Sequence, residues 1–187
     1  MIRKTLFGIL LLISYSLFGQ KTTLENWTEN EKKQYTKLIE LVNYVYHKEE
    51  TEISKDTLFE KYIYFDYVLN DTNKGRKEKR LAKFDAIFYY FRKTVDSLGI
   101  KNLDAKPIRF YKNNKIYKPF NEKQTKLKTV GEEKMYTKDV NVFAYYKKEE
   151  PENPLGCLLF EPKTNKLVAW IMIEQGGYKY FLTFNFL

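Results

Sequence analysis

The spacing of the apolar residues changes once along this chain, near residue 105, and that change constrains the fold more than any other feature. Before residue 105 the apolar side chains recur every three or four residues, the period of an amphipathic helix. After it they alternate with polar ones, the period of a strand with one buried face. Helices followed by strands indicate an α+β domain, with the helices packed on one face of an antiparallel sheet.

Three helices are predicted in the first half of the chain. The first begins at a capping box formed by Thr28 and Glu31 and ends between residues 47 and 50. The second begins at residue 56 or 57 and ends before the Asn-, Asp- and Gly-rich break at residues 70–75. The third spans about residues 76–98, ends at Gly99, and carries a long aromatic stripe that we expect to lie across the sheet.

The second half predicts about five or six antiparallel strands. They cover residues 108–112, 115–119, 140–148, 155–161, 166–175 and 178–187. A turn at Asn113-Asn114 joins the first two, and the polar residues 121–134 form a loop. This element order resembles that of cystatin-like and NTF2-like rolls, in which a curved sheet wraps a long helix and can enclose a pocket. The resemblance carries no motif and assigns no function.

Two turns set the register of the last three strands. A two-residue turn at Gly176-Gly177 pairs Glu174 with Lys179, which places opposite charges across the hairpin. Continued along both strands, this register also pairs Ala169 with Phe184. A four-residue turn at residues 162–165 places Glu161 opposite Lys166 and, further along, Cys157 opposite Trp170.

These registers divide the apolar residues between two sheet faces. The first, assigned to the surface beneath the helices, carries Leu158, Phe160, Leu167, Ala169, Ile171, Ile173, Tyr180, Leu182, Phe184 and Phe186. The second carries Leu155, Cys157, Leu159, Val168, Trp170, Met172 and Phe181. A single antiparallel sheet does not normally leave so much apolar surface in water. A curled sheet, residues 121–134, a second subunit or a ligand would cover it, so Cys157, Trp170, Met172 and Phe181 are the candidate binding residues.

The N-terminus predicts export. Arg3 and Lys4 precede an apolar stretch at residues 6–13, and small residues follow, as in a secretory signal peptide. The apolar stretch is shorter than the ~20 residues of a membrane-spanning helix. We expect cleavage after Gly19, with cleavage after Ser16 as the second choice, leaving one domain over residues 20–187 that is periplasmic or secreted. An uncleaved membrane anchor is the alternative, and no later segment predicts a membrane span.

Residue usage weighs against several chemistries. The chain has one histidine, His47, and one cysteine, Cys157, so neither an intrachain disulfide nor a tetrahedral zinc site is expected, and no cofactor motif occurs. There is no nucleophile elbow and no phosphate-binding glycine loop. The net charge is +9, but lysine supplies it and arginine is scarce, so specific nucleic-acid binding is not expected. The basic run at residues 74–80 is interpreted as an exposed helix start; contact with lipid phosphates or an anionic glycan is the alternative.

These observations favour an exported, non-enzymatic domain that binds a small apolar ligand or a protein partner through the second sheet face. The alternative is a hydrolase that acts on envelope or external polymers through a pair of carboxylates, one of them with a raised pKa. A third hypothesis is a cationic surface protein held to anionic envelope components, which moderate salt would release.

Overall fold

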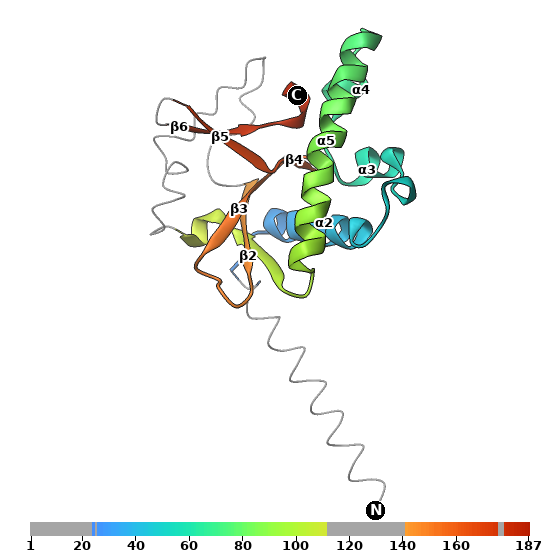
Figure 1. Cartoon of the computed structure of the whole chain (residues 1–187). Coiled ribbons are helices and arrows are strands. Elements are labelled where there is room, and N and C mark those ends of the chain that lie inside the picture. The colour runs from blue at the N-terminus through green and yellow to red at the C-terminus, as the bar shows by residue number, and fades with distance from the viewer. Residues whose placement is uncertain (1–23, 25, 112–140, 176–177) are drawn as a thin grey trace, which may run out of the picture.

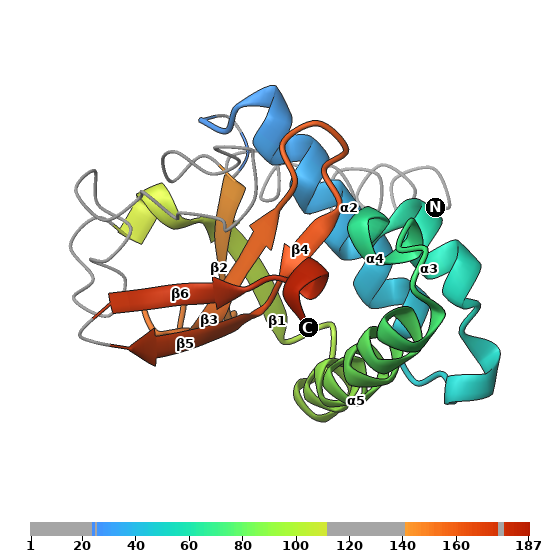
Figure 2. The ribbon, with the colours of Figure 1, turned by 90° about the horizontal axis from the view of Figure 1, so that it is seen from above.

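The computed structural model describes residues 24, 26–111, 141–175 and 178–187. Within these residues, helices gather on one side of the molecule and antiparallel strands on the other (Figure 1 and Figure 2). The predicted mixture of helix and antiparallel sheet is therefore confirmed, while the finer likeness to a cystatin-like or NTF2-like roll stays a prediction. No helix in the described ranges combines the length and apolar character needed to cross a bilayer.

The first helix, α2 (Glu29–Val45), begins as predicted. The backbone N–H of Glu31 donates to the Thr28 hydroxyl at 3.2 Å, and the Thr28 N–H donates to the Glu31 carboxylate at 2.7 Å. This capping box satisfies two backbone donors that the helix itself leaves without partners. The helix ends at Val45, slightly before the predicted 47–50, and His47 adopts a positive φ of 54°.

The single helix predicted from residue 56 or 57 to the break at residue 70 is wrong: the segment forms α3 (Lys55–Lys61) and α4 (Asp66–Leu69). Between them, Ile63 forms an isolated parallel bridge with Leu167 of the sheet. The Tyr64 N–H donates to the Leu167 carbonyl, and the Leu167 N–H donates to the Tyr62 carbonyl, both at 2.8 Å. These bonds to the sheet replace helical ones and bury Ile63, which explains the interruption.

The long helix α5 (Lys74–Leu98) confirms the third prediction. The Asn73 side chain accepts the N–H of Arg76 and caps its start. At its end, Gly99 has a φ of 75°, a conformation that costs a residue with a side chain more than it costs glycine. Phe84, Phe88 and Val95 on this helix are buried.

The strands form two sheets. The first has the order β1-β2-β3-β4, built from β1 (Leu103–Pro107), β2 (Val142–Lys147), β3 (Pro154–Phe160) and β4 (Leu167–Ala169); the second pairs β5 (Ile171–Gln175) with β6 (Tyr178–Leu182).

The predicted strand at 108–112 is wrong, since Ile108–Tyr111 is a 3-10 helix, η2, that follows β1. Ile108 and Tyr111 are both buried, and residues three apart share one side of a 3-10 turn. The predictions for 115–119, Asn113-Asn114 and 121–134 lie outside the described residues.

The register of the last hairpin is confirmed over β5 and β6. Glu174 pairs with Lys179 and Ile171 with Leu182, although Gly176 and Gly177 themselves lie outside the described residues. The prediction fails beyond Ile171. Trp170 belongs to no strand, and Phe184–Phe186 forms a short 3-10 helix, η5, so Ala169 does not pair with Phe184.

A register shift between β3 and β4 changes the faces on which Ala169 and Trp170 lie. Phe160 pairs with Leu167 as predicted, but Leu159 then pairs with Ala169 instead of Val168. A one-residue shift places the side chains directly beside it on the opposite face. Ala169 therefore joins the second face and Trp170 the helical side, so the prediction that Cys157 lies opposite Trp170 is wrong.

Two apolar cores result. The larger lies between helices and sheet, and includes Phe84 and Phe88 from α5, Leu158 and Phe160 from β3, and Phe184. The smaller joins the second sheet face to η2, and contains Ile108, Tyr111, Val142, Ala144, Tyr146, Cys157, Leu159, Val168, Ala169 and Phe181. Much of the second face is thus buried by other described residues of the chain, including Ile108 and Tyr111 of η2.

Candidate ligand pocket

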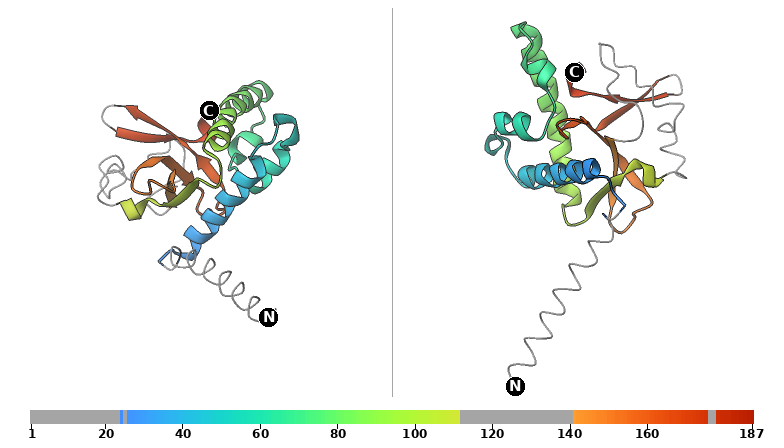
Figure 3. Two further views of the ribbon diagram at one scale, coloured as in Figure 1. Left: turned by 60° about the horizontal axis from the view of Figure 1, so that its bottom comes forward. Right: turned by 180° about the vertical axis from the view of Figure 1, so that it is seen from behind.

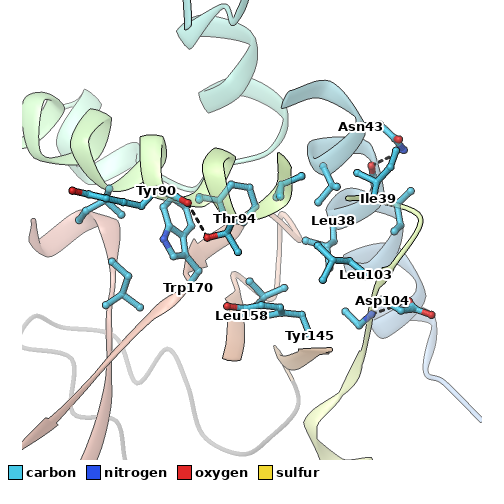
Figure 4. Close-up of a pocket in the computed structure, with 17 residues that line it drawn as sticks. Leu38, Ile39, Asn43, Tyr90, Thr94, Leu103, Asp104, Tyr145, Leu158 and Trp170 are labelled. Carbon is cyan, nitrogen blue, oxygen red and sulfur yellow. Dashed lines mark hydrogen bonds between the residues drawn. The ribbon is translucent and has the colours of Figure 1, made fainter. Parts of the chain in front are cut away.

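A pocket of about 410 Å³ lies between α2, α5 and the sheet (Figure 4). The two helices cross one another on the helical side of the molecule (Figure 1 and Figure 3), and the pocket occupies the space between their facing sides and the strands. Its volume falls within the range of small-molecule sites, ~300–1,000 Å³.

Each helix contributes one stripe of side chains to the pocket wall. Leu38 and Val42 are four residues apart on α2, and Ile87, Phe91 and Val95 follow at intervals of four on α5. Residues four apart lie on one face of a helix, so each stripe presents a continuous apolar surface. The periodicity that makes these helices amphipathic therefore also makes the pocket wall apolar.

Trp170 forms the aromatic wall between α5 and the sheet. Its ring centroid lies 4.8 Å from that of Phe91 and 4.5 Å from that of Phe184. Ring pairs at these separations attract one another and hold the indole from both sides. Because Trp170 is only partly buried and lines the pocket, part of its surface remains available to a ligand.

Tyr145 on β2 and Leu158 on β3 line the sheet side of the pocket (Figure 4). Tyr145 is the register partner of Gly156, and its ring lies over that glycine. Burial, together with the neighbouring Cys157, raises the pKa of the Tyr145 phenol above its usual value. The phenol is therefore neutral at physiological pH and adds no charge to the pocket.

Several polar atoms at the pocket have partners within the protein. The Asn43 amide donates to the Ile39 carbonyl and the Thr94 hydroxyl donates to the Tyr90 carbonyl, both at 2.9 Å (Figure 4). Asp104 accepts the Tyr35 hydroxyl at 2.8 Å. Polar groups that are already bonded offer little to a polar ligand, so the pocket favours apolar contact.

Asp104 also joins Tyr35 and Tyr146 into a small network behind the pocket. Burial and the adjacent carboxylate raise the pKa of Tyr146 to about 12 and that of Tyr35 further. Both phenols therefore stay protonated and donate to Asp104, and the network anchors β1 to α2 and β2.

The four candidate binding residues do not lie together. Cys157 (1 % exposed) and Phe181 (7 % exposed) belong to the smaller core, against which the partly buried Met172 packs. Trp170 lies on the other side of the sheet and lines the pocket. The helical spacing of apolar residues is consistent with Leu38, Val42, Phe91 and Val95 lying on apolar helix faces, but it does not predict a space between the two helices.

Buried carboxylates serve as structural anchors. Glu31 pairs with Arg109 at 2.7 Å; burial alone would raise the pKa of Glu31, but hydrogen bonds from Arg109 and Thr28 outweigh it and the net shift is downward. The hydrogen bond from Arg76 lowers the pKa of Asp71 to about 2. The carboxylate of Glu161 accepts the N–H groups of the turn that follows it. The lowered pKa values of Glu31 and Asp71 are the opposite of the raised pKa expected of a general acid.

The described residues hold no group of three or more histidine, cysteine or carboxylate side chains arranged to hold a metal ion. His47, the one histidine, is exposed, and its Nδ1 lies 3.8 Å from a carboxylate oxygen of Asp96. Comparison with protein-family models, with curated proteins and with solved structures finds no match to this chain.

Proposed function

We propose that this chain is an exported, non-enzymatic binding domain that takes a small apolar ligand into the pocket between α2 and α5. The observation that carries the proposal is the pocket itself: about 410 Å³ in volume, and lined mainly by aliphatic and aromatic side chains. A preformed cavity of this size with apolar walls is the usual form of a small-molecule site.

The energetics of the pocket favour an apolar occupant over water. A buried water needs two to four polar partners, and Asn43, Thr94 and Asp104 already have hydrogen-bond partners within the protein. An apolar ligand gains about 25 cal/mol for each Å² of apolar surface removed from water. The pocket lies between two helices and a sheet, so a ligand in it contacts protein on several sides, which suits a small molecule better than a flat protein surface.

The experiment that tests this proposal uses the neutral apolar dye N-phenyl-1-naphthylamine and the mature chain. Trp27 and Trp170 both fluoresce, so the titration is repeated in the Trp27→Phe variant, in which Trp170 supplies the signal. We expect saturable dye binding at one site per chain, with quenching of Trp170 by the bound dye.

The matched variants are Ile87→Trp, which places bulk inside the pocket, and Tyr67→Trp, which adds a ring at an exposed position on α4 outside it. We expect Ile87→Trp to bind the dye at least tenfold more weakly and Tyr67→Trp to bind it like the parent. Equal binding by both variants, or no saturable binding by the parent, would show that the pocket is not a ligand site.

A further inference from the structure

A second hollow, of about 480 Å³, lies along the first turns of α5 and is strongly basic. Arg76, Lys79, Arg80 and Lys83 line it, and the C-terminal residue Leu187 borders it. It is more open than the apolar pocket and shares one element with it, α5, whose later turns carry the pocket residues Ile87 to Val95.

The two hollows lie on the same side of α5. Arg76, Lys83, Ile87, Tyr90 and Thr94 follow one another at intervals of seven, four, three and four residues, which keeps them on one helix face. Lys83 precedes Ile87 by four residues, or about 6 Å along the helix axis at ~1.5 Å per residue. The lining residues of the two hollows are therefore separated by about one helical turn along α5.

Charge is divided between the two sides of α5. Its three carboxylates, Glu78, Asp85 and Asp96, lie about half a turn away from Lys83, and Asp85 pairs there with Lys55 at 2.6 Å. The basic side thus faces no carboxylate of its own helix, and the nearby carboxylate that offsets part of its charge is Asp71, which precedes the helix.

Asp71, just before the helix, is the carboxylate that pairs within this group. It bonds to Arg76, and its Oδ2 lies 3.9 Å from Nη1 of Arg80, a buried atom with no hydrogen-bond partner in the described part of the chain. Lys79 and Lys83 are exposed and have no ion-pair partner among the described residues. The hollow therefore retains donors and positive charge for an anion.

We propose that the ligand of this protein is an amphipathic anion, with its apolar part in the pocket and its carboxylate or phosphate head group in the basic hollow along α5. This inference rests on the proposed function and adds the ligand class. The exposed ammonium groups of Lys79 and Lys83 receive the anionic oxygens, while Asp71 keeps Arg76 in place. The same basic side chains would bind a carboxylate or a phosphate. Probes that share one apolar tail and differ only in the head group therefore show which of the two is preferred.

The test is a calorimetric titration of the mature chain with three twelve-carbon probes: dodecanoate and dodecyl phosphate below their micelle concentrations, and neutral dodecanol below its solubility limit. The variant is Lys79→Gln/Lys83→Gln. The control, matched in charge, is Lys33→Gln/Lys163→Gln, which alters exposed positions away from α5.

We expect the parent to bind an anionic probe more tightly than dodecanol, by about tenfold for two exposed charge contacts. The Lys79→Gln/Lys83→Gln variant should lose this advantage and bind dodecanol unchanged, whereas the control should behave like the parent. Added salt should weaken the binding of the anion only. The tighter of the two anions identifies the head group as carboxylate or phosphate.

The other outcomes separate the two proposals. If dodecanol and the anions bind the parent equally, or if both double variants weaken anion binding to the same extent, the anionic head-group site is refuted while the apolar pocket stands. If no probe binds the parent, the proposed function itself fails, and the ligand class fails with it.

Discussion

The ring of Tyr145 lies across Gly156 on the neighbouring strand, so closely that a Cβ at position 156 would stand 2.7 Å from both Cε1 and Oη of the tyrosine. The two residues are register partners in the β2–β3 pair. Real side chains do not approach so closely, so the absence of a side chain at Gly156 is what permits this ring position. Since Tyr145 lines the pocket, a glycine that does not itself line it helps to set the pocket's shape.

Replacing Gly156 with alanine should therefore displace the Tyr145 ring and alter the pocket. We expect Gly156→Ala to lower the free energy of unfolding by about 1–3 kcal/mol, as other overpacking substitutions do, and to change the dye affinity. Urea denaturation and dye titration measure the two effects. The control is Gly75→Ala in the first turn of α5, where a Cβ would meet nothing closer than 3.8 Å; it should stabilise the protein by about 0.5–1 kcal/mol and bind the dye normally. Wild-type stability and affinity in Gly156→Ala would contradict this account of Tyr145.

The two tryptophans should respond differently to truncation. Trp27 is 7 % exposed and packs edge-on against Tyr35 and Phe143, whereas Trp170 is partly open to the pocket. We expect Trp27→Ala to cost about 3–5 kcal/mol of unfolding free energy and Trp170→Ala less than about 3 kcal/mol, because a side chain already beside a space leaves less new cavity. Only Trp170→Ala should weaken dye binding in protein that remains folded. Equal stability losses with unchanged affinity would assign Trp170 to the closed core.

The ion pair of Glu31 and Arg109 should make stability depend on pH in the acid range. The pKa of Glu31 is lowered in the folded chain, so between the folded and unfolded pKa values the unfolded chain binds more protons. The stabilising contribution of the ion pair is complete above the unfolded pKa of Glu31, about 4.3. It is lost as pH falls through the lower pKa of the folded chain. Glu31→Gln should cost about 2 kcal/mol at pH 7 and flatten the acid slope. Urea midpoints from pH 2 to pH 7 test this, and parallel parent and variant curves would exclude the pair as the cause.

The export prediction has a direct test. The full chain, expressed with its N-terminus intact in a bacterium with a secretory pathway, should yield a mature protein that begins at Gln20 and is recovered from the periplasm or the medium. Intact-mass spectrometry of each cell fraction gives the cleavage site, and a start at Leu17 would show cleavage after Ser16 instead. Full-length chain confined to the membrane fraction would support an uncleaved anchor.

Features that depend on neighbouring residues could be predicted from the sequence. The capping box of Thr28 and Glu31, the length of α5 up to Gly99 and the pairing of Glu174 with Lys179 each depend on residues close together in the chain. These features have local physical causes: a side chain that hydrogen-bonds to nearby backbone, a helical spacing of apolar residues and a short turn. Each of these acts within a few residues.

The candidate site could be predicted only in part. Trp170 was among the predicted binding residues and lines the pocket, but it was grouped with Cys157, Met172 and Phe181 because strict alternation was carried through the β3–β4 hairpin. The register shift at Leu159 and Phe160 moves Trp170 to the helical side, where it meets Phe91. The basic residues before Lys83 were also recognised, while their alignment with the pocket on α5 needed the arrangement of both hollows.

The sequence by itself determined the class of the fold, the start of α2, the extent of α5 and the register of the last hairpin, because local hydrogen bonding and hydrophobic period decide these. Only the tertiary structure decided that Ile63 bridges to Leu167 and divides one predicted helix into two, that Trp170 turns towards α5, and that α2 and α5 leave a space of about 410 Å³ between them. Each of these depends on contacts between residues far apart in the chain, whose packing overrides the local pattern.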